Sequence, residues 1–303
     1  TAFLFAGQGA QYLGMARDFY EQYDVVKSTF EEASQVLGYD VRALIDQDEE
    51  KLNQTRYTQP AILTTSLAIY RLLAEKGIRP AMVAGLSLGE YSALVAAGAL
   101  DFKTALALVA KRGAFMEEAA PAGSGKMVAV LNADVALIEE ACQTASQLGV
   151  VSPANYNTPG QIVIGGDVAA VDKAVELLKE AGVKRLIPLN VSGPFHTALL
   201  KPASEKLAQV LAETEFTEFQ LPLVGNTEAD IMEASRIKEL LTRQIIEPVR
   251  FYDSIAKMQE AGVTEFIEIG PGKVLSGFMK KIDKSAIVHS VESVETLTAL
   301  LEK

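Results

Sequence analysis

The chain has 303 residues, 49% of them hydrophobic, and a formal net charge of −11. This length and apolar content allow one large or two modest domains with packed cores. The negative charge argues against non-specific binding to nucleic acid, and no apolar run approaches the length of a membrane span.

Short apolar runs alternate with amphipathic stretches in the N-terminal part, which is typical of an α/β protein. The strand-like run AFLFA (2–6) ends in the glycine-bearing loop GQGAQ, and AMVA (81–84) predicts a second short buried strand. A strand begins almost at once and no cleavable signal pattern opens the chain, so we expect a soluble protein. Helices are predicted at 25–37, 58–76, 88–97 and 101–119.

The pattern changes between two glycine- and proline-bearing segments, PAGSG (121–125) and SGP (192–194), which we interpret as hinges. The elements between them follow the order βαββαβ, which is typical of a ferredoxin-like unit. Its predicted strands are 126–131, 150–155, 161–166 and 184–189, and its helices are 133–147 and 167–181, with YNTPG (156–160) as the turn between the middle strands. Residues 126–192 are therefore predicted to form a small inserted subdomain.

After this insert the α/β pattern returns. Helices are predicted at 197–213, 236–246 and 274–282, a strand at 264–269, and a further strand around His289. Residues 1–125 and 193–303 are therefore predicted to form the large subdomain.

Ser87 lies between two glycines in Gly85-Leu86-Ser87-Leu88-Gly89. A predicted strand ends just before this stretch and a predicted helix begins just after it. A sharp strand-to-helix turn needs small neighbours for a projecting nucleophile, and the helix directs its first amides at negative charge that develops there. An ordinary turn is the alternative. The context favours a nucleophilic serine.

A nucleophilic serine needs a base, and the chain has two histidines. His289 is interpreted as a packed or surface histidine in a strand, whereas His196 lies where the second hinge enters a helix. We therefore favour His196, although a structural histidine near a helix start remains open. No convincing carboxylate precedes it at a strand end, so a backbone or amide oxygen is expected to orient the imidazole.

The numbers of cysteines and histidines bear on the cellular compartment of the protein and on whether it can bind a metal. The single cysteine, Cys142, cannot form an internal disulfide, and this fits a reducing cytoplasm. Two histidines exclude a multi-histidine metal site, and no zinc-ligand spacing occurs. We expect a cytoplasmic protein with no metal.

Arg112 falls within the apolar stripe of the predicted helix 101–119, four residues after Leu108 and three before Phe115. A guanidinium directed inward needs an anion, because a buried unpaired charge is costly. Its planar fork suits a carboxylate bound by two hydrogen bonds. A surface arginine is the default for a helix. The placement favours an acyl substrate that ends in a carboxylate.

Eight ordered motifs resemble the bacterial malonyl-CoA:acyl carrier protein transacylases of the acyltransferase family. They run from the first residues to about residue 283 and so cover nearly the whole chain. The matching stretches are FAGQGAQYLGMARDFY, YTQPAILTTSLAIYR, GLSLGEYSALVAAGAL, KRGAFMEEA, NYNTPGQIVIGG, GPFHTALL, RQIIEPVRF and EIGPGKVLSGFMKKI.

The resemblance implies a fold and a reaction. The fold would be an α/β-hydrolase-like core with a parallel sheet and an inserted ferredoxin-like subdomain. The reaction would move a malonyl group from malonyl-CoA to the phosphopantetheine thiol of acyl carrier protein through a malonyl-serine ester, without a cofactor. A free-standing chain of this length favours fatty acid over polyketide synthesis, and we expect a monomer.

The resemblance also implies residue roles. Ser87 would be the acylated nucleophile, His196 its general base, and Arg112 the partner of the malonyl carboxylate. The main-chain N–H groups of Gln8 and Leu88 would form the oxyanion hole. The main-chain carbonyl of Gln244 would orient His196. The substrate cleft would be lined by Asn157, Gln161 and Gln59.

Two positions bear on specificity. The family commonly has histidine where this chain has Leu86, so we expect an altered pocket wall beside an intact nucleophile. Phe195 resembles the malonyl-selective pattern. Lys184 and Arg185, expected near the subdomain boundary, are candidates for docking the acidic carrier, although a solvated strand end is an equal alternative.

Two other functions remain open. A lipase- or esterase-type hydrolase shares the turn around Ser87 but uses water as the acceptor and gains little from an inward arginine. A non-catalytic binding scaffold would carry no acyl group on Ser87 at all.

Overall fold

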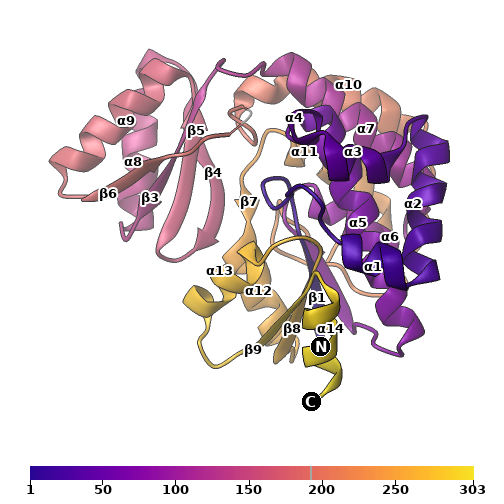
Figure 1. Ribbon diagram of the computed structural model, residues 1–303. Helices are drawn as coiled ribbons and strands as arrows, with labels where there is room; N and C mark the ends of the chain where they lie inside the picture. The colour runs from indigo at the N-terminus through magenta and orange to yellow at the C-terminus, as the bar shows by residue number, and fades with distance from the viewer. Residues whose placement is uncertain (192) are drawn as a thin grey trace.

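Two β-sheets organise the computed structural model of the protein, which describes residues 1–191 and 193–303 (Figure 1). Ser192, the predicted last residue of the small subdomain and part of its second hinge, lies outside the described residues. The first sheet is parallel throughout, with the strand order β2-β1-β8-β9. Its strands are β1 (Ala2–Phe5), β2 (Met82–Gly85), β8 (Glu265–Ile269) and β9 (Ile287–Val291).

The central strand β1 is buried along its whole length, as a continuous apolar run in a sheet covered on both faces should be. It pairs with β2 on one side and β8 on the other, with Ala2 opposite both Met82 and Phe266. Because the strands are parallel, their carboxyl ends meet at one edge. Ligands of open α/β sheets bind at that edge.

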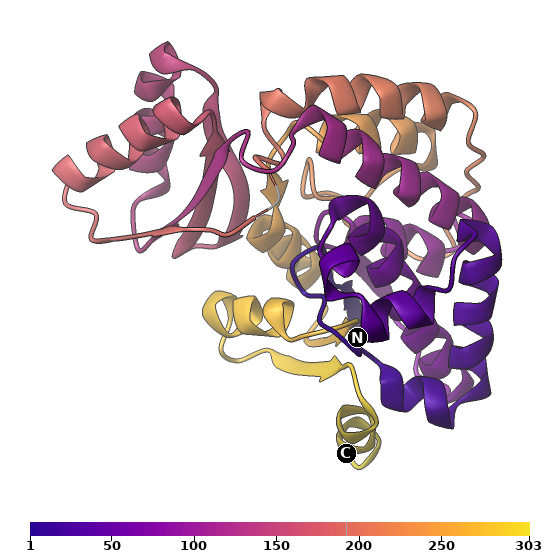
Figure 2. The ribbon, with the colours of Figure 1, turned by 45° about the horizontal axis from the view of Figure 1, so that its top comes forward.

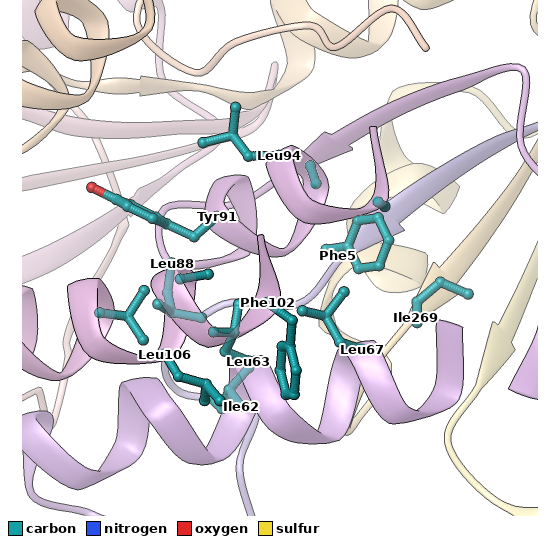
Figure 3. Close-up of a cluster of buried hydrophobic side chains, with 14 of the residues drawn as sticks. Phe5, Ile62, Leu63, Leu67, Leu88, Tyr91, Leu94, Phe102, Leu106 and Ile269 are labelled. Atoms are coloured by element: carbon teal, nitrogen blue, oxygen red, sulfur yellow. The ribbon is translucent and has the colours of Figure 1, made fainter. Parts of the chain in front are cut away.

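Helices surround the first sheet (Figures 1 and 2). They are α1 (Arg17–Gln22), α2 (Asp24–Leu37), α3 (Val41–Gln47), α4 (Glu49–Leu52), α5 (Thr55–Glu75), α6 (Gly89–Ala96), α7 (Phe102–Ala119), α10 (Lys201–Ala212), α11 (Ile237–Gln244), α12 (Phe251–Glu260), α13 (Val274–Ile282) and α14 (Val294–Leu301). Figure 3 shows Ile62, Leu63 and Leu67 of α5 directed toward α6, where they join the largest buried apolar cluster. This packing fixes α6 and α7 against α5.

The second sheet has the strand order β6-β3-β5-β4-β7. Its elements are β3 (Lys126–Leu131), α8 (Val135–Ala145), β4 (Val151–Thr158), β5 (Gln161–Gly166), α9 (Val168–Glu180), β6 (Arg185–Pro188) and β7 (Val249–Arg250). Helices α8 and α9 cover the face turned away from the first sheet (Figures 1 and 2), and their apolar sides form a separate core. Strand β7 comes from the C-terminal part and extends this sheet, which sequence patterning did not predict.

The predicted α/β class and parallel sheet are confirmed, with differences in single elements. The expected turn 156–160 is wrong in part, because β4 continues to Thr158 and pairs with β5 through two register shifts. The predicted helix 197–213 begins instead with a short 3₁₀ turn at Ala198–Leu200. The helices α1, α3, α4, α12 and α14 were not predicted. For α1, α3 and α4 the reason is length, because stretches this short carry few turns of apolar periodicity.

Close backbone packing at the end of β2 explains the glycines around Ser87. A Cβ on Gly89 would lie 2.1 Å from the carbonyl oxygen of Phe5, and one on Gly85 would lie 2.0 Å from the carbonyl carbon of Gly89. No real side chain tolerates such distances. The first turn of α6 therefore rests directly on β1.

We predict that Gly89→Ala lowers the free energy of unfolding by about 2 kcal/mol or more, because overpacking of this kind forces backbone shifts. Gly277→Ala in α13 is the matched control, since a Cβ there meets nothing within 4 Å. That control should be neutral or stabilising by up to about 1 kcal/mol, as expected for glycine replaced within a helix. Urea unfolding of the three proteins measures the difference, and equal effects of the two substitutions would contradict the packing described here.

Candidate active site

Ser87 lies at the carboxyl end of β2, in the tight turn that leads into α6. Its φ is +55°, in the left-handed region that non-glycine residues rarely adopt. This conformation projects the side chain from the turn, and Ser87 Oγ lies 2.7 Å from His196 Nε2. A strained serine in hydrogen-bond contact with an imidazole is the arrangement of an activated nucleophile.

His196 also has a positive φ, +62°, and its side chain is buried. Its Nδ1 lies 2.7 Å from the main-chain carbonyl oxygen of Gln244, at the end of α11. A carbonyl oxygen only accepts, so Nδ1 carries the proton and Nε2 accepts from Ser87. Burial lowers the pKa of His196 to about 4, although the Gln244 carbonyl favours the charged form. The imidazole is therefore a neutral base at neutral pH.

Arg112 is 1% exposed, which confirms that this residue of α7 faces inward. Its Nη1 donates to Gln59 Oε1 at 2.8 Å, and its Nη2 donates to Gln244 Oε1 at 3.0 Å and to Ser87 Oγ at 3.3 Å. The guanidinium carbon also lies 5.2 Å from the centre of the Tyr91 ring. Two neutral amides and an aromatic ring thus hold a buried cation beside the nucleophile.

No carboxylate within the described residues forms a salt bridge with Arg112. Glu90 acts on it only at longer range. Burial lowers the pKa of the guanidinium, and the nearby Glu90 and Tyr91 only partly oppose this effect. A buried cation without an ion pair is costly to maintain. The arrangement is suited to an anion that arrives with the substrate.

The N–H groups of Gln8 and Leu88 have no hydrogen-bond acceptor within residues 1–191 and 193–303. Both lie at the carboxyl edge of the parallel sheet, Gln8 after β1 and Leu88 at the start of α6. The Gln8 side chain is fixed, because its Nε2 donates to Thr55 Oγ1 at 3.1 Å and its Oε1 accepts from Gln59 Nε2 at 3.5 Å. Two unpaired main-chain donors near a nucleophile can stabilise an oxyanion.

Sequence reasoning missed Asn226, which is 1% exposed. Its Oδ1 accepts from the Ser87 N–H at 2.8 Å, and its Nδ2 donates to the Gly85 carbonyl at 2.6 Å. Its own main-chain N–H donates to Glu90 Oε2 at 2.7 Å, and burial raises the pKa of Glu90 to about 7. Asn226 is 139 residues from Ser87, so no local pattern marks it.

The remaining predicted residues lie apart from this cluster. Asn157 Nδ2 donates to Gln161 Oε1 at 2.9 Å across the β4–β5 hairpin, but no hydrogen bond among the described residues joins this pair to Ser87, His196 or Arg112. His289 lies on β9 beside Lys303. Leu86 is half-buried and packs against the apolar cluster that contains Val249 and Phe251.

The placement of Lys184 and Arg185 near a subdomain boundary was wrong. Arg185 begins β6, the outer strand of the second sheet, and pairs with Leu131 at the end of β3. β7, which the C-terminal part contributes, lies at the opposite edge of that sheet (Figure 1). Both cations line a surface hollow of about 390 Å³, together with residues that follow β3 and residues that follow α9.

Comparison with known proteins agrees with the geometry of the site. The acyl transferase domain family matches residues 2–300. The malonyl CoA-acyl carrier protein transacylase of Bacillus subtilis (strain 168) is 49% identical over 99% of this chain and 96% of its own length. This chain belongs to the malonyl CoA-acyl carrier protein transacylase family.

Solved structures of this transacylase family share the whole fold. MCAT from Streptococcus pneumoniae, known from a crystal structure, shares 73% sequence identity with this chain. The two structures superimpose with a TM-score of 0.99, and the match covers 99% of each chain. A malonyl-transacylase solved in complex with a type II polyketide acyl-carrier protein is 47% identical with a TM-score of 0.96 and covers 99% of this chain and 98% of that one. The two-sheet arrangement is therefore that of the family.

The described part of the chain has neither a metal-binding cluster nor a membrane-spanning helix. No group of three His, Cys, Asp or Glu side chains there could hold a metal ion. No helix there combines the length and the apolar character needed to cross a membrane.

We predict that the rate of Ser87 acylation stays constant from about pH 8 down to about pH 5.5. The base is active in its neutral form, and burial keeps His196 neutral until the pH approaches about 4. Quenched-flow acylation followed by intact mass spectrometry gives the profile. A half-maximal rate near pH 6.5, the ordinary pKa of histidine, would contradict the assigned environment.

Proposed function

We propose that this protein transfers the malonyl group of malonyl-CoA to the phosphopantetheine thiol of acyl carrier protein, through a malonyl ester on Ser87, in fatty acid biosynthesis. The observation that carries the proposal is the buried Arg112 guanidinium, whose Nη2 lies 3.3 Å from Ser87 Oγ. Full-length relatives named malonyl CoA-acyl carrier protein transacylase support it.

In the first half-reaction, Ser87 Oγ attacks the thioester carbonyl of malonyl-CoA while His196 Nε2 accepts its proton. The main-chain carbonyl of Gln244 holds the tautomer that makes this transfer possible. The carbonyl oxygen becomes an oxyanion that the N–H groups of Gln8 and Leu88 stabilise. When the carbon–sulfur bond breaks, His196 returns the proton to the CoA thiolate.

The second half-reaction reverses these roles. The carrier thiol gives its proton to His196 and attacks the malonyl-serine ester, and the same two N–H groups stabilise the second oxyanion. The carbon–oxygen bond to Ser87 breaks, and His196 returns the proton to Ser87 Oγ. One base and one oxyanion hole therefore serve both acceptors.

Arg112 selects the acyl group in this proposal. Its fork can bind the free malonyl carboxylate by charge-assisted hydrogen bonds, while Gln59 and Gln244 hold the guanidinium in place. An acetyl group offers no such partner. The family resemblance places Asn157 and Gln161 along the substrate cleft as well, and we retain them as proposed contacts.

We also propose the finer fold description and the domain division. The first sheet and its helices would be the α/β-hydrolase-like core, residues 1–125 and 193–303. The element order βαββαβ from β3 to β6, with antiparallel pairs β4–β5, β3–β5 and β3–β6, supports a ferredoxin-like insert at 126–192.

The partners follow from the reaction. CoA thioesters and acyl carrier protein are the proposed substrates, and the carrier complex of a 47% identical malonyl-transacylase supports the latter. The mechanism requires no metal or redox cofactor. A monomeric state and a cytoplasmic location stay predictions from the sequence.

Hydrolysis is the alternative reaction, because a lipase or esterase shares the serine turn. The inward Arg112 argues against it, since a simple esterase gains little from a buried cation beside its nucleophile. A non-catalytic scaffold is less consistent still with a serine held 2.7 Å from a neutral imidazole.

We predict that malonyl-CoA alone converts the enzyme to a long-lived malonyl adduct on Ser87, and that holo-acyl carrier protein discharges it. Intact mass spectrometry follows both steps, with Ser87→Ala as the control that forms no adduct. Continuous CoA release without carrier would indicate hydrolysis, and no adduct at all would indicate a scaffold. Discharge by carriers of fatty acid and polyketide synthesis, compared at equal concentration, separates the two pathways.

A further inference from the structure

Asn226 binds the main chain on both sides of Leu86 in the turn that carries Ser87. Its side-chain oxygen accepts from the Ser87 N–H at 2.8 Å, and its side-chain nitrogen donates to the Gly85 carbonyl at 2.6 Å. One side-chain amide thereby bonds to two main-chain groups of the turn and holds them at a fixed distance. The contact opposes the strain of Ser87, whose φ of +55° is unfavourable for a residue with a Cβ.

Asn226 is itself held on three sides. Its main-chain N–H donates to Glu90 Oε2 at 2.7 Å, and its carbonyl accepts from the Arg250 N–H at 2.9 Å. Gln244 Nε2 donates to its side-chain oxygen at 3.1 Å and to the Ser87 carbonyl at 3.0 Å. The side chain cannot rotate without breaking these contacts, so it is a rigid support for the turn.

The contacts of Asn226 also determine which main-chain N–H groups of the turn are free to bind a ligand. Asn226 occupies the N–H of Ser87, whereas the next N–H, that of Leu88, has no acceptor within the described part of the chain. The oxyanion that forms on the carbonyl oxygen of the acyl group therefore meets a Leu88 donor that is already oriented. If the Ser87 N–H were released, the peptide planes on both sides of Ser87 could rotate, and Oγ would lose its alignment with His196.

We infer that Asn226 is a positioning residue that holds Ser87 in its attacking conformation and leaves the Leu88 N–H directed at the developing oxyanion. This inference rests on the proposed role of Ser87 as the nucleophile. It does not depend on which acyl group the enzyme accepts, because Asn226 donates to and accepts from the turn and does not contact Arg112 directly.

The test uses a small uncharged alkyl fluorophosphonate, which modifies an activated serine and has no carboxylate for Arg112. Asn226→Ala should react about 100-fold more slowly than the native enzyme, since small displacements of reacting groups carry penalties of that size. Thr227→Val is the matched control, because it removes a buried neighbouring hydroxyl that has no partner among the described residues. It should react at the native rate.

Asn226→Asp supplies a readout that general loosening would not reproduce. When ionised, the new carboxylate cannot donate to the Gly85 carbonyl and repels it; when protonated, it donates there and still accepts from Ser87. Its rate relative to the native enzyme should rise as the pH falls from about 8 to about 5.5, by up to about tenfold per pH unit. His196 stays neutral over this range, and taking the ratio to the native enzyme removes the titration that both proteins share at Glu90, whose pKa burial raises to about 7. The charged or titratable side chains nearest the position are Glu90, Arg112, His196 and Arg250.

Three results would overturn the inference: native-like reactivity of Asn226→Ala, a flat pH ratio for Asn226→Asp, or failure of both variants to fold, which would make Asn226 a folding residue instead. Melting temperatures of all variants decide the last point. Failure of the proposed malonyl transfer gives a different result. In that case the native enzyme reacts with the fluorophosphonate but forms no malonyl adduct, and the role of Asn226 is unaffected.

Discussion

The constraint on which the site depends is a buried guanidinium that forms no salt bridge with any residue of the described chain. Arg112 is held by the side-chain oxygens of Gln59 and Gln244 and lies against Tyr91, so its position is fixed while its charge is not neutralised. Burying such a charge costs stability. The fold tolerates this cost beside Ser87, where in the proposed reaction a dicarboxylic acyl group would bring the anion.

The residues that hold this cation also hold the catalytic pair. Gln244 binds Arg112 through its side-chain oxygen, the Ser87 carbonyl through its side-chain nitrogen, and His196 through its main-chain carbonyl. Asn226 then connects Gln244 to the serine turn. Ser87, His196 and Arg112 are therefore parts of one hydrogen-bond network. A change in one member is expected to move the others.

The sequence allowed the main chemical groups to be predicted because each has a local signature. Ser87 lies in a glycine-bounded strand-to-helix turn, Arg112 interrupts an apolar stripe, and His196 was one of only two imidazoles. The main-chain donors Gln8 and Leu88 and the carbonyl of Gln244 came from family resemblance, since a main-chain role leaves no trace in residue type. The parallel sheet followed from its alternating elements.

What could not be predicted depends on contacts between distant segments. Asn226 reaches the serine turn across 139 residues, and β7 joins the second sheet from the C-terminal part. Lys184 and Arg185 are close to the boundary in sequence, but they lie at the start of β6, the edge strand of the second sheet far from β7, because strand order and not chain order sets distance in a sheet. Tertiary pairing of this kind has no local periodicity to reveal it.

Selection of the acyl group by Arg112 is tested most directly by comparing Ser87 acylation from malonyl-CoA and acetyl-CoA in the native enzyme, Arg112→Ala and Lys111→Ala. Lys111 is the exposed neighbour on the same helix and controls for loss of charge. A charge-assisted pair contributes about 1.5–3 kcal/mol, so Arg112→Ala should reduce the preference for malonyl over acetyl by about tenfold to a hundredfold, while Lys111→Ala leaves it unchanged. Equal losses with both thioesters in Arg112→Ala would contradict the account.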